Sequence, residues 1–447
     1  MEQRIPGQTD VVIVGAGTAG CSAAMPAARA GLSVLLVEKC GAADVGNKVC
    51  GNGISVEGLK EVSRYVPPPD GPEVAARVEG GRICILEEGP GTHISVSGLI
   101  INRALFGQRL LSDALSAGAC LADETTCVGW SDRKSRRIRV RSGNGEETDV
   151  GASVVIDASG FRSVLTRSGG PTRADEPLRS EVGVGYREIL ALGEPLEEST
   201  GGFIVLSPPG AERGYAWAFP MGGRLANVGI GRTLDNHEGS LKSAYDAFVA
   251  GRPEFRDAET VSAGAGMLPL RRPLDSMVGD GFMSVGDSAC HASPVHGGGI
   301  ASSIIAGVMA GEQAVEALAD GDTSAAGLWG YAVRFMREVG ATYAAHEVVR
   351  GLVYSLSRQD LAFLASEYIK ADALVEAVAG GNLLPSLVVG ARRLASLSRR
   401  PRLIANVVAT SRSMAAVRQH YLDYPESPEG LASWTGRAEY LRRSVRR

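Results

Sequence analysis

The sequence predicts an α/β fold, with a smaller antiparallel sheet inserted into it and a helical region at the C-terminal end. Three observations support this prediction. An apolar run at residues 11–14 enters a glycine-rich turn and then a helix-favouring stretch. Short β-like runs alternate with turns over residues 181–275, and the pattern beyond residue 330 is mostly helical. Continuous apolar runs bounded by turns are typical of strands buried on both faces, so the first sheet is expected to be parallel.

Each predicted element follows from its local pattern. The strand at 11–14 leads through a turn at 15–20 into a helix at 21–30, and a second apolar run predicts a strand at 34–37. Residues 39–60 are glycine-rich and aperiodic, which predicts a loop. Apolar residues recur at helical spacing over 101–117, and Gly118 is well placed to end that helix. Further patterns predict strands at 138–140, 154–156 and 282–285 and a helix from residue 299.

Composition narrows the class of function. The chain has 447 residues, which suggests two or three domains. Its 46 basic and 50 acidic residues give a formal charge of −4, which excludes nucleic-acid binding that rests on overall basicity. Glycine is in excess, with 58 residues, whereas aromatic residues make up only 5%. The places where glycines and aromatic residues gather are therefore informative.

Cysteines and apolar runs bear on the compartment. The seven cysteines include no CxxC pair and no Cys/His cluster at zinc spacing, which predicts a reduced, cytoplasmic protein without a structural metal. Two nearby histidines, His291 and His296, lack further ligands at metal spacing. No run of eighteen apolar residues predicts a membrane span, and the polar N-terminal stretch does not have the pattern of a signal peptide.

A glycine fingerprint forms the first turn. GAGTAG at residues 15–20 follows a predicted strand and opens a predicted helix, and Glu38 ends the next strand. Gly15 permits the tight turn, Gly17 lets the backbone approach a pyrophosphate at the helix N-terminus, and Gly20 lets helix and strand pack closely. Glu38 is expected to accept hydrogen bonds from an adenosine ribose. The alternative is a plain strand-turn-helix without a ligand.

A second segment indicates which dinucleotide binds. Gly286 and Asp287 follow an apolar strand, and Pro294 and a run of glycines at 297–299 come next; this arrangement resembles the second flavin segment of the glutathione-reductase type of FAD fold. In that fold the aspartate binds the ribitol chain, and backbone N–H groups at a helix N-terminus face the flavin. A positive helix end stabilises anionic reduced flavin. FAD is therefore the expected cofactor, and the absence of a second fingerprint implies that any NAD(P)H binds transiently.

Two further motifs narrow the family. KVCGNG at residues 48–53 resembles the cysteine motif of the geranylgeranyl reductase family, and YAWAFP at 215–220, followed after eight residues by GIG at 229–231, matches the YxWxFP-x8-GxG substrate motif of that family. With GAGTAG and GDSA at 286–289, the resemblance covers roughly residues 8–330. It implies an FAD-dependent reductase of isoprenoid chains, with a glutathione-reductase-type FAD domain and an antiparallel-sheet substrate domain. DASG at 157–160 resembles an intermediate motif of the fold, to which no catalytic role is assigned.

The fingerprint and the family resemblance together imply a set of site residues. The catalytic candidate is Cys50, which the resemblance puts beside the isoalloxazine ring. The expected cofactor-binding residues are Gly15, Gly17, Gly20, Ser22, Glu38, Cys50, Gly51, Gly53, Arg103, Val128, Asp287, Gly298, Gly299 and Ile300. The expected substrate residues are Tyr215, Trp217, Phe219, Pro220, Gly229 and Gly231.

The stripe Tyr215, Trp217 and Phe219 alternates with period two, so in a strand all three side chains point to one face. There they could line an apolar slot for a polyprenyl tail, and the alternative is ordinary sheet core. Cys50 could instead be a small buried apolar residue, and Arg103 a solvated helix arginine. An isolated alkene needs a proton as well as a hydride, and Cys50, His296 and an ordered water are all candidates for the proton donor.

The sequence thus predicts an FAD-dependent reductase that saturates geranylgeranyl chains of membrane lipids, with archaeal-type ether phospholipids as the expected substrates. Chlorophyll or quinone head groups stay open, as does the electron donor, which could be ferredoxin, NAD(P)H or a deazaflavin. The alternatives are a flavin monooxygenase or halogenase of the same fold and a non-catalytic prenyl-lipid carrier.

The expected division of the chain is an FAD-binding domain at 1–170 and 276–330, a substrate sheet at 171–275 and a helical region at 331–447. A stretch from Ala391 to Arg418 holds seven arginines and no acidic residue, and this favours peripheral contact with an anionic membrane surface. A solvated helix face is the alternative. The arginines stand at positions 392, 393, 399, 400, 402, 412 and 418.

Overall fold

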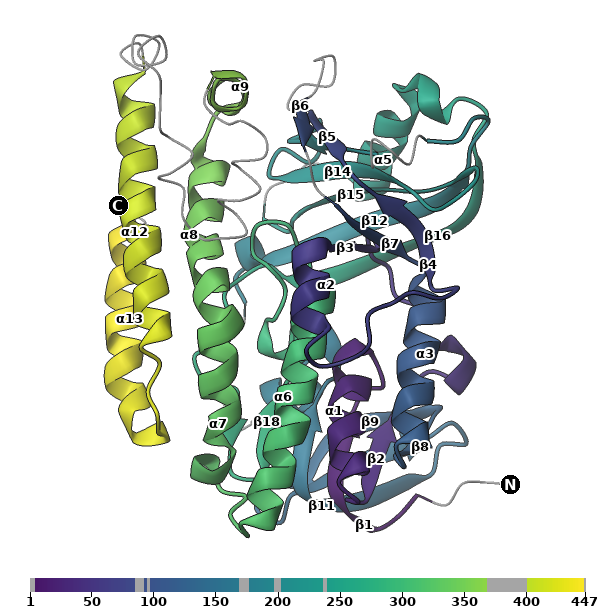
Figure 1. Cartoon of the computed structure of the whole chain (residues 1–447), viewed down its shortest axis with the longest axis vertical. Coiled ribbons are helices and arrows are strands. Elements are labelled where there is room, and N and C mark those ends of the chain that lie inside the picture. The colour runs from purple at the N-terminus through teal and green to yellow at the C-terminus, as the bar shows by residue number, and fades with distance from the viewer. Residues whose placement is uncertain are drawn as a thin grey trace.

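The computed structural model describes residues 5–84, 92–94, 97–168, 177–196, 202–235, 239–367 and 400–445. The chain builds a main sheet with the strand order β17-β18-β11-β1-β2-β8, a second sheet, and a column of C-terminal helices along one flank of both (Figure 1). The main path is parallel except for the short β17–β18 pair. Its strands are β1 (Gln8–Val14), β2 (Val34–Val37), β8 (Cys120–Ala122), β11 (Glu147–Asp157), β17 (Val278–Gly279) and β18 (Phe282–Ser284).

Helices cover one face of the main sheet, and a β-hairpin covers the other. On the helical face lie α1 (Thr18–Arg29), α3 (Arg103–Ser116) and α6 (Ile300–Ala319). A Cβ added to Gly307 or Gly311 of α6 would lie 2.3 Å or 2.2 Å from a carbonyl oxygen of α1, so these glycines let the two helices touch. The opposite face is packed by β9 (Thr125–Asp132), β10 (Arg137–Ser142) and α4 (Val164–Arg167). The predicted parallel strands and the three helices predicted at 21–30, at 101–117 and from residue 299 are confirmed.

The second sheet has the order β16-β12-β15-β14-β13-β5-β6 and is antiparallel apart from the β13–β5 pair. The predicted antiparallel region supplies β12 (Val182–Ala191), β13 (Phe203–Leu206), β14 (Gly214–Pro220), β15 (Leu225–Thr233) and β16 (Glu259–Pro269). The strands β5 (Gly81–Cys84) and β6 (Thr92–Ile94) come from much earlier in the chain. One face packs on α5 (Leu241–Ala250), which leaves the other face toward the main sheet.

The loop predicted for residues 39–60 is wrong beyond Gly53. A 3-10 helix (Ala42–Asp44) is followed by β3 (Gly53–Ser55) and α2 (Val56–Val62). The strand β3 pairs with β7 (Gly98–Ile101), which also pairs with β4 (Val74–Val78), in a small third sheet. The three residues of β3 are too few to show the alternating pattern of a strand. Their partner strand, β7, lies more than forty residues further along the chain. Ser55 caps α2 by accepting from the N–H of Gly58 at 3.1 Å, a start signal that the sequence does contain.

The C-terminal region is helical, as predicted. It comprises α7 (Ala325–Phe335), a π-helical turn (Met336–Gly340), α8 (Ala341–Ser355), α9 (Arg358–Glu367), α12 (Pro401–Leu422) and α13 (Leu431–Val445). The helices α8, α12 and α13 stand side by side, from the level of the main sheet to that of the second sheet (Figure 1). Within the described residues, no helix is long and apolar enough to cross a membrane. The division of the chain into domains stays a prediction, and Arg392, Arg393 and Arg399 lie outside the described residues.

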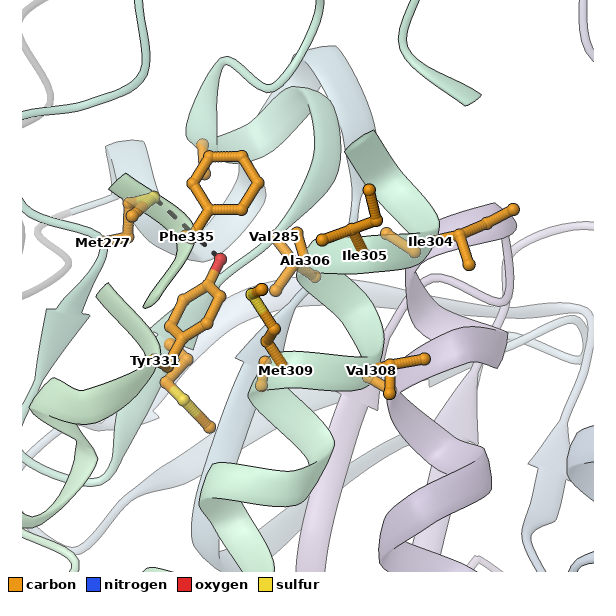
Figure 2. Packing of buried hydrophobic residues seen from close by; sticks show 14 of the residues in the cluster. Met277, Val285, Ile304, Ile305, Ala306, Val308, Met309, Tyr331 and Phe335 are labelled. Carbon is orange, nitrogen blue, oxygen red and sulfur yellow. Dashed lines mark hydrogen bonds between the residues drawn. The ribbon is translucent and has the colours of Figure 1, made fainter. Parts of the chain in front are cut away.

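The main core forms where α6 and α7 close over the end of the main sheet. Figure 2 shows Val285 beside Ala306 and Met309 of α6, with Tyr331 of α7 packed against them. The Tyr331 ring is fully buried, and its hydroxyl donates to the carbonyl oxygen of Ser284 at 2.8 Å. This bond fixes the last residue of β18 just before the turn that carries Asp287.

Tyr331→Phe should lower the free energy of unfolding by about 1–2 kcal/mol, because the buried carbonyl of Ser284 loses a hydrogen bond. Urea unfolding followed by circular dichroism measures the change. Tyr440→Phe is the matched control, since Tyr440 is 72% exposed. Equal stabilities of the two variants would contradict the importance of this bond.

Candidate functional site

The glycine turn after β1 permits a close approach. Gly15 has a φ of +103°, and a Cβ added there would lie 2.4 Å from the carbonyl oxygen of Ala158. A Cβ on Gly20 would lie 1.8 Å from the carbonyl oxygen of Gly15, so both positions exclude a side chain. Gly17, the N-cap of α1, has no atom of the described residues within 4 Å of an added Cβ. The free N–H groups of α1 therefore face open space, an arrangement that binds phosphate.

Glu38 closes this turn from the end of β2. Its carboxylate accepts hydrogen bonds from the backbone N–H of Ala16 at 2.8 Å and of Cys40 at 3.1 Å. Its carbonyl oxygen accepts from the N–H of Thr125 at the start of β9. Val128 lies further along β9 with its side chain 44% exposed. Each carboxylate oxygen of Glu38 keeps a lone pair for a further donor such as a ribose hydroxyl.

Arg103 reaches the same turn from the first position of α3. Asn102 caps that helix by accepting a backbone N–H of its first turn. The Arg103 guanidinium donates from Nη2 to the hydroxyl of Thr18 at 2.9 Å, while Nε and Nη1 are buried without a partner among the described residues. Burial lowers the pKa of Arg103, and the nearby Cys50 and Asp287 oppose that shift. Two unpartnered donors on a buried cation require acceptors, and the phosphate and ribityl oxygens of FAD fit this need.

Asp287 lies in a turn that His291 holds. The N–H of Gly286 donates to Nδ1 of His291 at 3.1 Å, and Nε2 contacts the sulfur of Met277 at 3.0 Å. Phe335 stacks on the ring, with 3.9 Å between the ring centroids. Because Nδ1 accepts, the ring carries its proton on Nε2. Burial lowers the pKa of His291 to about 3, so the ring is neutral at physiological pH.

His291 is thus a structural residue of the flavin turn. No group of three or more metal-ligating side chains occurs within the described residues. Asp157 plays a similar part in the neighbouring turn, where its fully buried carboxylate accepts from the N–H groups of Ser159, Leu165 and Thr166. The bond from Gly286 spans only five positions, but the contacts of the ring with Met277 and Phe335, which come from other elements, leave no local sign in the sequence.

Lys48 connects the cysteine loop, residues 48–53, to the flavin turn. Its Nζ lies 2.7 Å from Oδ2 of Asp287, whose side chain is buried. Gly299 is the N-cap of α6, between Gly298 and Ile300, and a Cβ added to it would lie 3.8 Å from Oδ1 of Asp287. Asp287 therefore lies between the cysteine loop and the N-terminus of α6. The motif contained Lys48, but the pairing was not predicted.

Two of the predicted cofactor residues, Ser22 and Gly53, differ in exposure, since Ser22 is fully buried and Gly53 is exposed. Ser22 is fully buried on α1. A Cβ added to Gly307 of α6 would lie 2.8 Å from the Cβ of Ser22. Its hydroxyl has no partner among the described residues. Gly53 begins β3, where a Cβ would be in ordinary contact with Ile100. The assignment of both residues to FAD stays a prediction.

The aromatic stripe and the two glycines of the GxG motif lie opposite each other in one β-hairpin. In the β14–β15 ladder, Tyr215 is opposite Gly231 and Trp217 is opposite Gly229. A Cβ on Gly229 would lie 2.2 Å from the indole ring, so the glycine is required by the ring that lies across it. The rings of Tyr215 and Trp217 are adjacent, with 5.7 Å between their centroids. The eight-residue gap of the motif is therefore the path around the hairpin.

The stripe lies on the face of the sheet that the cysteine loop covers, as predicted from its period. Phe219 shares that face, whereas Pro220 has the opposite parity and pairs with Ala226 at the end of β14. The cysteine loop crosses this face. Its Val49 packs against Gly264 and Gly266 of β16, and a Cβ on its Gly51 would lie 3.4 Å from the ring of Phe219 and 3.7 Å from the indole nitrogen of Trp217.

Asn227, which the sequence analysis missed, joins the loop to the stripe. The indole N–H of Trp217 donates to Oδ1 of Asn227 at 2.9 Å, and Nδ2 of Asn227 donates to the carbonyl oxygen of Cys50 at 2.8 Å. Asn227 is fully buried and lies opposite Phe219 in the ladder. The hairpin register implied by the motif could have placed it on the site face, two residues before Gly229.

Positive charge surrounds Cys50. The half-buried Arg187 lies opposite Gly229 on the same sheet face, and its Nη1 donates to the hydroxyl of Ser262 at 3.1 Å. Burial lowers the pKa of Arg187, and the nearby Cys50 opposes that shift, as it does for Arg103. The Cys50 sulfur itself accepts from the N–H of Asn52 at 3.3 Å. The thiol is half-buried rather than a sealed core residue.

A third side of the site comes from α8. The hydroxyl of Tyr215 donates to the carbonyl oxygen of His296 at 2.7 Å. The His296 ring packs edge-on to His346 of α8 and accepts from the N–H of Gly298 through Nδ1. The His296 side chain is exposed at its surface, yet surrounding protein and the nearby His346 lower its pKa to about 4. With its pKa lowered in this way, the ring is neutral at pH 7.

Two family models match the chain. The model described as FAD dependent oxidoreductase matches residues 10–184, and the model described as geranylgeranyl reductase catalytic domain matches residues 182–268. The first contains the glycine turn, the cysteine loop and Arg103. The second contains β12, β14 and β15 with the aromatic stripe. The boundary between the two models coincides with the start of the second sheet at Val182.

Curated relatives resemble nearly the whole chain. A digeranylgeranylglycerophospholipid reductase of Sulfolobus acidocaldarius is 31% identical over 95% of this chain and 95% of its own length. Proteins with the same name from Methanothrix thermoacetophila and Methanopyrus kandleri are 33% and 34% identical over 79% and 80% of this chain, covering 89% and 94% of their own lengths.

Solved structures agree in fold. A geranylgeranyl bacteriochlorophyll reductase-like protein from Thermoplasma acidophilum has a TM-score of 0.74 at 25% identity, with 90% of this chain and 99% of that chain covered. The myxobacterial chondrochloren halogenase has a TM-score of 0.64 at 15% identity, with 98% of both chains covered. At that identity the halogenase shares the fold alone.

Arg103→Met should weaken FAD binding about tenfold to a hundredfold, because a buried hydrogen bond to a charged group contributes about 1.5–3 kcal/mol. Titration of the deflavinated protein with FAD, followed by quenching of flavin fluorescence, measures the change. Arg256→Met, which removes an exposed arginine, is the control. Unchanged affinity in Arg103→Met would contradict a role in holding FAD.

His291 should make the folded state sensitive to acid. The pKa of its ring falls from 6.5 to about 3 on folding, so the unfolded chain binds a proton that the folded chain does not at any pH between these values. Stability is therefore complete above pH 6.5 and declines as the pH falls toward 3, by about 2 kcal/mol between pH 7 and pH 5. Urea unfolding of the wild type and of His291→Gln at both pH values isolates this contribution, since the variant should lose less stability on acidification. An equal loss in both proteins would refute it.

Proposed function

The chain belongs to the geranylgeranyl reductase family of FAD-dependent oxidoreductases, and from this premise we propose that it saturates the double bonds of geranylgeranyl chains in lipids. The observation that carries the proposal is the contact between the two halves of the site. Gly51 of the cysteine loop lies against Phe219 and Trp217 of the aromatic stripe, so a chain held along the stripe lies at the FAD side of the molecule.

FAD is held by the glycine turn and its neighbours. Gly17 leaves room for the pyrophosphate at the N-terminus of α1, Arg103 offers its two unpartnered nitrogens, and Asp287 lies next to the N-terminus of α6. When bound in its reduced form, FAD supplies the hydride that adds to one carbon of the double bond. The assignment of Cys50 to the flavin side is part of this proposal.

The stripe holds the chain and favours the charge that develops on it. An isolated alkene has no carbonyl to accept electron density, so addition of a proton and a hydride passes through cationic character at the tertiary carbon. The ring faces of Trp217 and Phe219 attract such a cation. Gly229 leaves room for the indole of Trp217, which lies across it, and Gly231 is opposite Tyr215, so the rings themselves form the surface on which the chain is proposed to lie.

Of the candidate proton donors, His296 is the least suited to act as a charged acid. Its Nδ1 already accepts from Gly298, and its pKa of about 4 keeps the ring neutral at pH 7. In this form it donates a hydrogen bond through Nε2. Cys50, whose sulfur accepts from the backbone N–H of Asn52, and an ordered water are the other two candidates.

The finer substrate and partners are also proposed. The relatives' name, digeranylgeranylglycerophospholipid reductase, supports an ether phospholipid of the archaeal type. The electron donor binds transiently, since one fingerprint serves FAD. Exposed arginines on α12, Arg402 and Arg412, support peripheral contact with an anionic membrane surface.

One experiment separates this function from the alternatives. The purified flavoprotein is reduced under anaerobic conditions and mixed with a geranylgeranyl lipid, and flavin absorbance and product mass are followed. Reoxidation with a gain of two hydrogens per double bond supports the reductase. Oxygenated or halogenated product, formed only when oxygen is admitted, would favour the monooxygenase or halogenase. Lipid binding without either product would indicate a carrier.

Trp217→Ala should reduce kcat/KM for the lipid by at least about tenfold while FAD content stays at the wild-type level, because loss of a large buried ring removes about 1.5–3 kcal/mol of apolar contact. Flavin content is read from absorbance and turnover from the anaerobic assay. Loss of FAD in this variant would mean that the stripe is structural core.

A further inference from the structure

We propose that Asn227 is a positioning residue that couples contact of the prenyl chain with Trp217 to the position of Cys50. This inference rests on the proposed function, because it concerns the same site. Asn227 is not a fixed position of either motif: it lies on β15, within the eight-residue gap of the aromatic motif, and forms hydrogen bonds to residues of both motifs.

The geometry makes Asn227 the link between the two motifs. Its amide oxygen accepts from the indole nitrogen of Trp217 at 2.9 Å, and its amide nitrogen donates to the carbonyl oxygen of Cys50 at 2.8 Å. The side chain is fully buried. An amide reversed about its last bond would set two donors against each other and two acceptors against each other, so the two bonds define one orientation.

The cysteine loop has few other anchors near Cys50. On one side Lys48 pairs with Asp287, and on the other the carbonyl oxygen of Asn52 accepts from the N–H of Ile101. Between them, the bond from Asn227 is the one that ties the Cys50 carbonyl to the second sheet within the described residues. Displacing Asn227 would therefore release the Cys50 carbonyl from the second sheet, while Val49 stays packed on Gly264 and Gly266.

The Trp217 ring is placed to sense the chain. It lies across Gly229, beside the ring of Tyr215, on the face proposed to hold the prenyl tail. Gly229, which lies opposite Trp217, has no side chain to hold the ring in place. A chain that presses on the indole shifts its N–H, and the short rigid amide transmits this shift to Cys50. The thiol is thus expected to respond to chain binding.

Alkylation of Cys50 tests this coupling. The oxidised holoenzyme, which has no hydride to transfer, is treated with iodoacetamide with and without geranylgeraniol, and labelling is quantified by mass spectrometry of peptides. Cys120 is exposed on β8, far in the fold from this loop, and serves as an internal reference. In the wild type, geranylgeraniol should change the rate at Cys50 severalfold and leave Cys120 unchanged.

Two variants separate the two hydrogen bonds. When its carboxyl group is ionised, Asn227→Asp keeps an acceptor for Trp217 but has no donor for the Cys50 carbonyl, so its Cys50 should label about tenfold faster, the factor expected for one lost buried hydrogen bond. Trp217→Phe keeps the bond to Cys50, so its unliganded rate should match the wild type, while the response to geranylgeraniol is lost. In anaerobic turnover, Asn227→Asp should lower kcat about tenfold with KM nearly unchanged.

Thr233→Val is the matched control, because Thr233 is a fully buried residue of the same strand whose hydroxyl has no partner among the described residues. Wild-type labelling in Thr233→Val and faster labelling confined to Cys50 in Asn227→Asp support the proposal. Wild-type labelling of Cys50 in Asn227→Asp overturns it, as does an equal rise at Cys120, which reports loosening of the whole fold.

The proposed function fails on a different result. If the reduced wild-type enzyme forms no hydrogenated product, the reductase assignment is wrong. The proposed effect of the prenyl chain on Cys50 is then wrong as well. If product forms but geranylgeraniol leaves the Cys50 rate of the wild type unchanged, the reductase stands and the coupling is overturned.

Discussion

The molecule depends on one close approach, in which a loop of the main domain lies directly on the face of the second sheet. That approach is permitted by missing side chains. Gly264 and Gly266 receive Val49, Gly51 fits beneath the rings of the stripe, and Gly229 lies under the indole of Trp217. A Cβ would lie 2.5 Å from Val49 at Gly264 and 2.2 Å from the indole of Trp217 at Gly229, so a side chain at either position would force these groups apart. The glycine excess of the chain thus has a physical purpose where the two sheets meet.

Burial of charge is the second constraint on the site. Arg103 and Arg187 are held near Cys50 with nitrogens that lack partners among the described residues, and Asp287 is buried beside Lys48. Unpaired buried charge is costly in a protein interior, so such a cluster persists where a charged or polar ligand completes it. His291 is buried without a charge. Burial lowers the pKa of its ring, so the ring is neutral and holds the flavin turn by hydrogen bonds.

The halogenase-like fold and the reductase-like site illustrate how little the fold alone decides. The same arrangement of sheets and helices occurs in the chondrochloren halogenase at 15% identity. In this chain, the residues to which we assign the chemistry lie on one hairpin and one loop. Here those two segments present an aromatic stripe backed by glycines and a cysteine loop tied to it through Asn227, which together suit an apolar chain.

The sequence by itself determined the parallel strands, the glycine turn, the one-faced stripe and the family, because each depends on a local period or on a motif of fixed spacing. Only the tertiary structure decided what those motifs touch. The loop predicted at 39–60 contains β3 and α2, since a three-residue strand is defined by a distant partner. Asn227 and Lys48 acquire their roles from residues 177 and 239 positions away, and the His291 ring is packed by Met277 and Phe335 from other elements. A hydrogen bond across such separations leaves no trace in the local pattern, which is why the site residues of the motifs could be predicted and those that hold them in place could not.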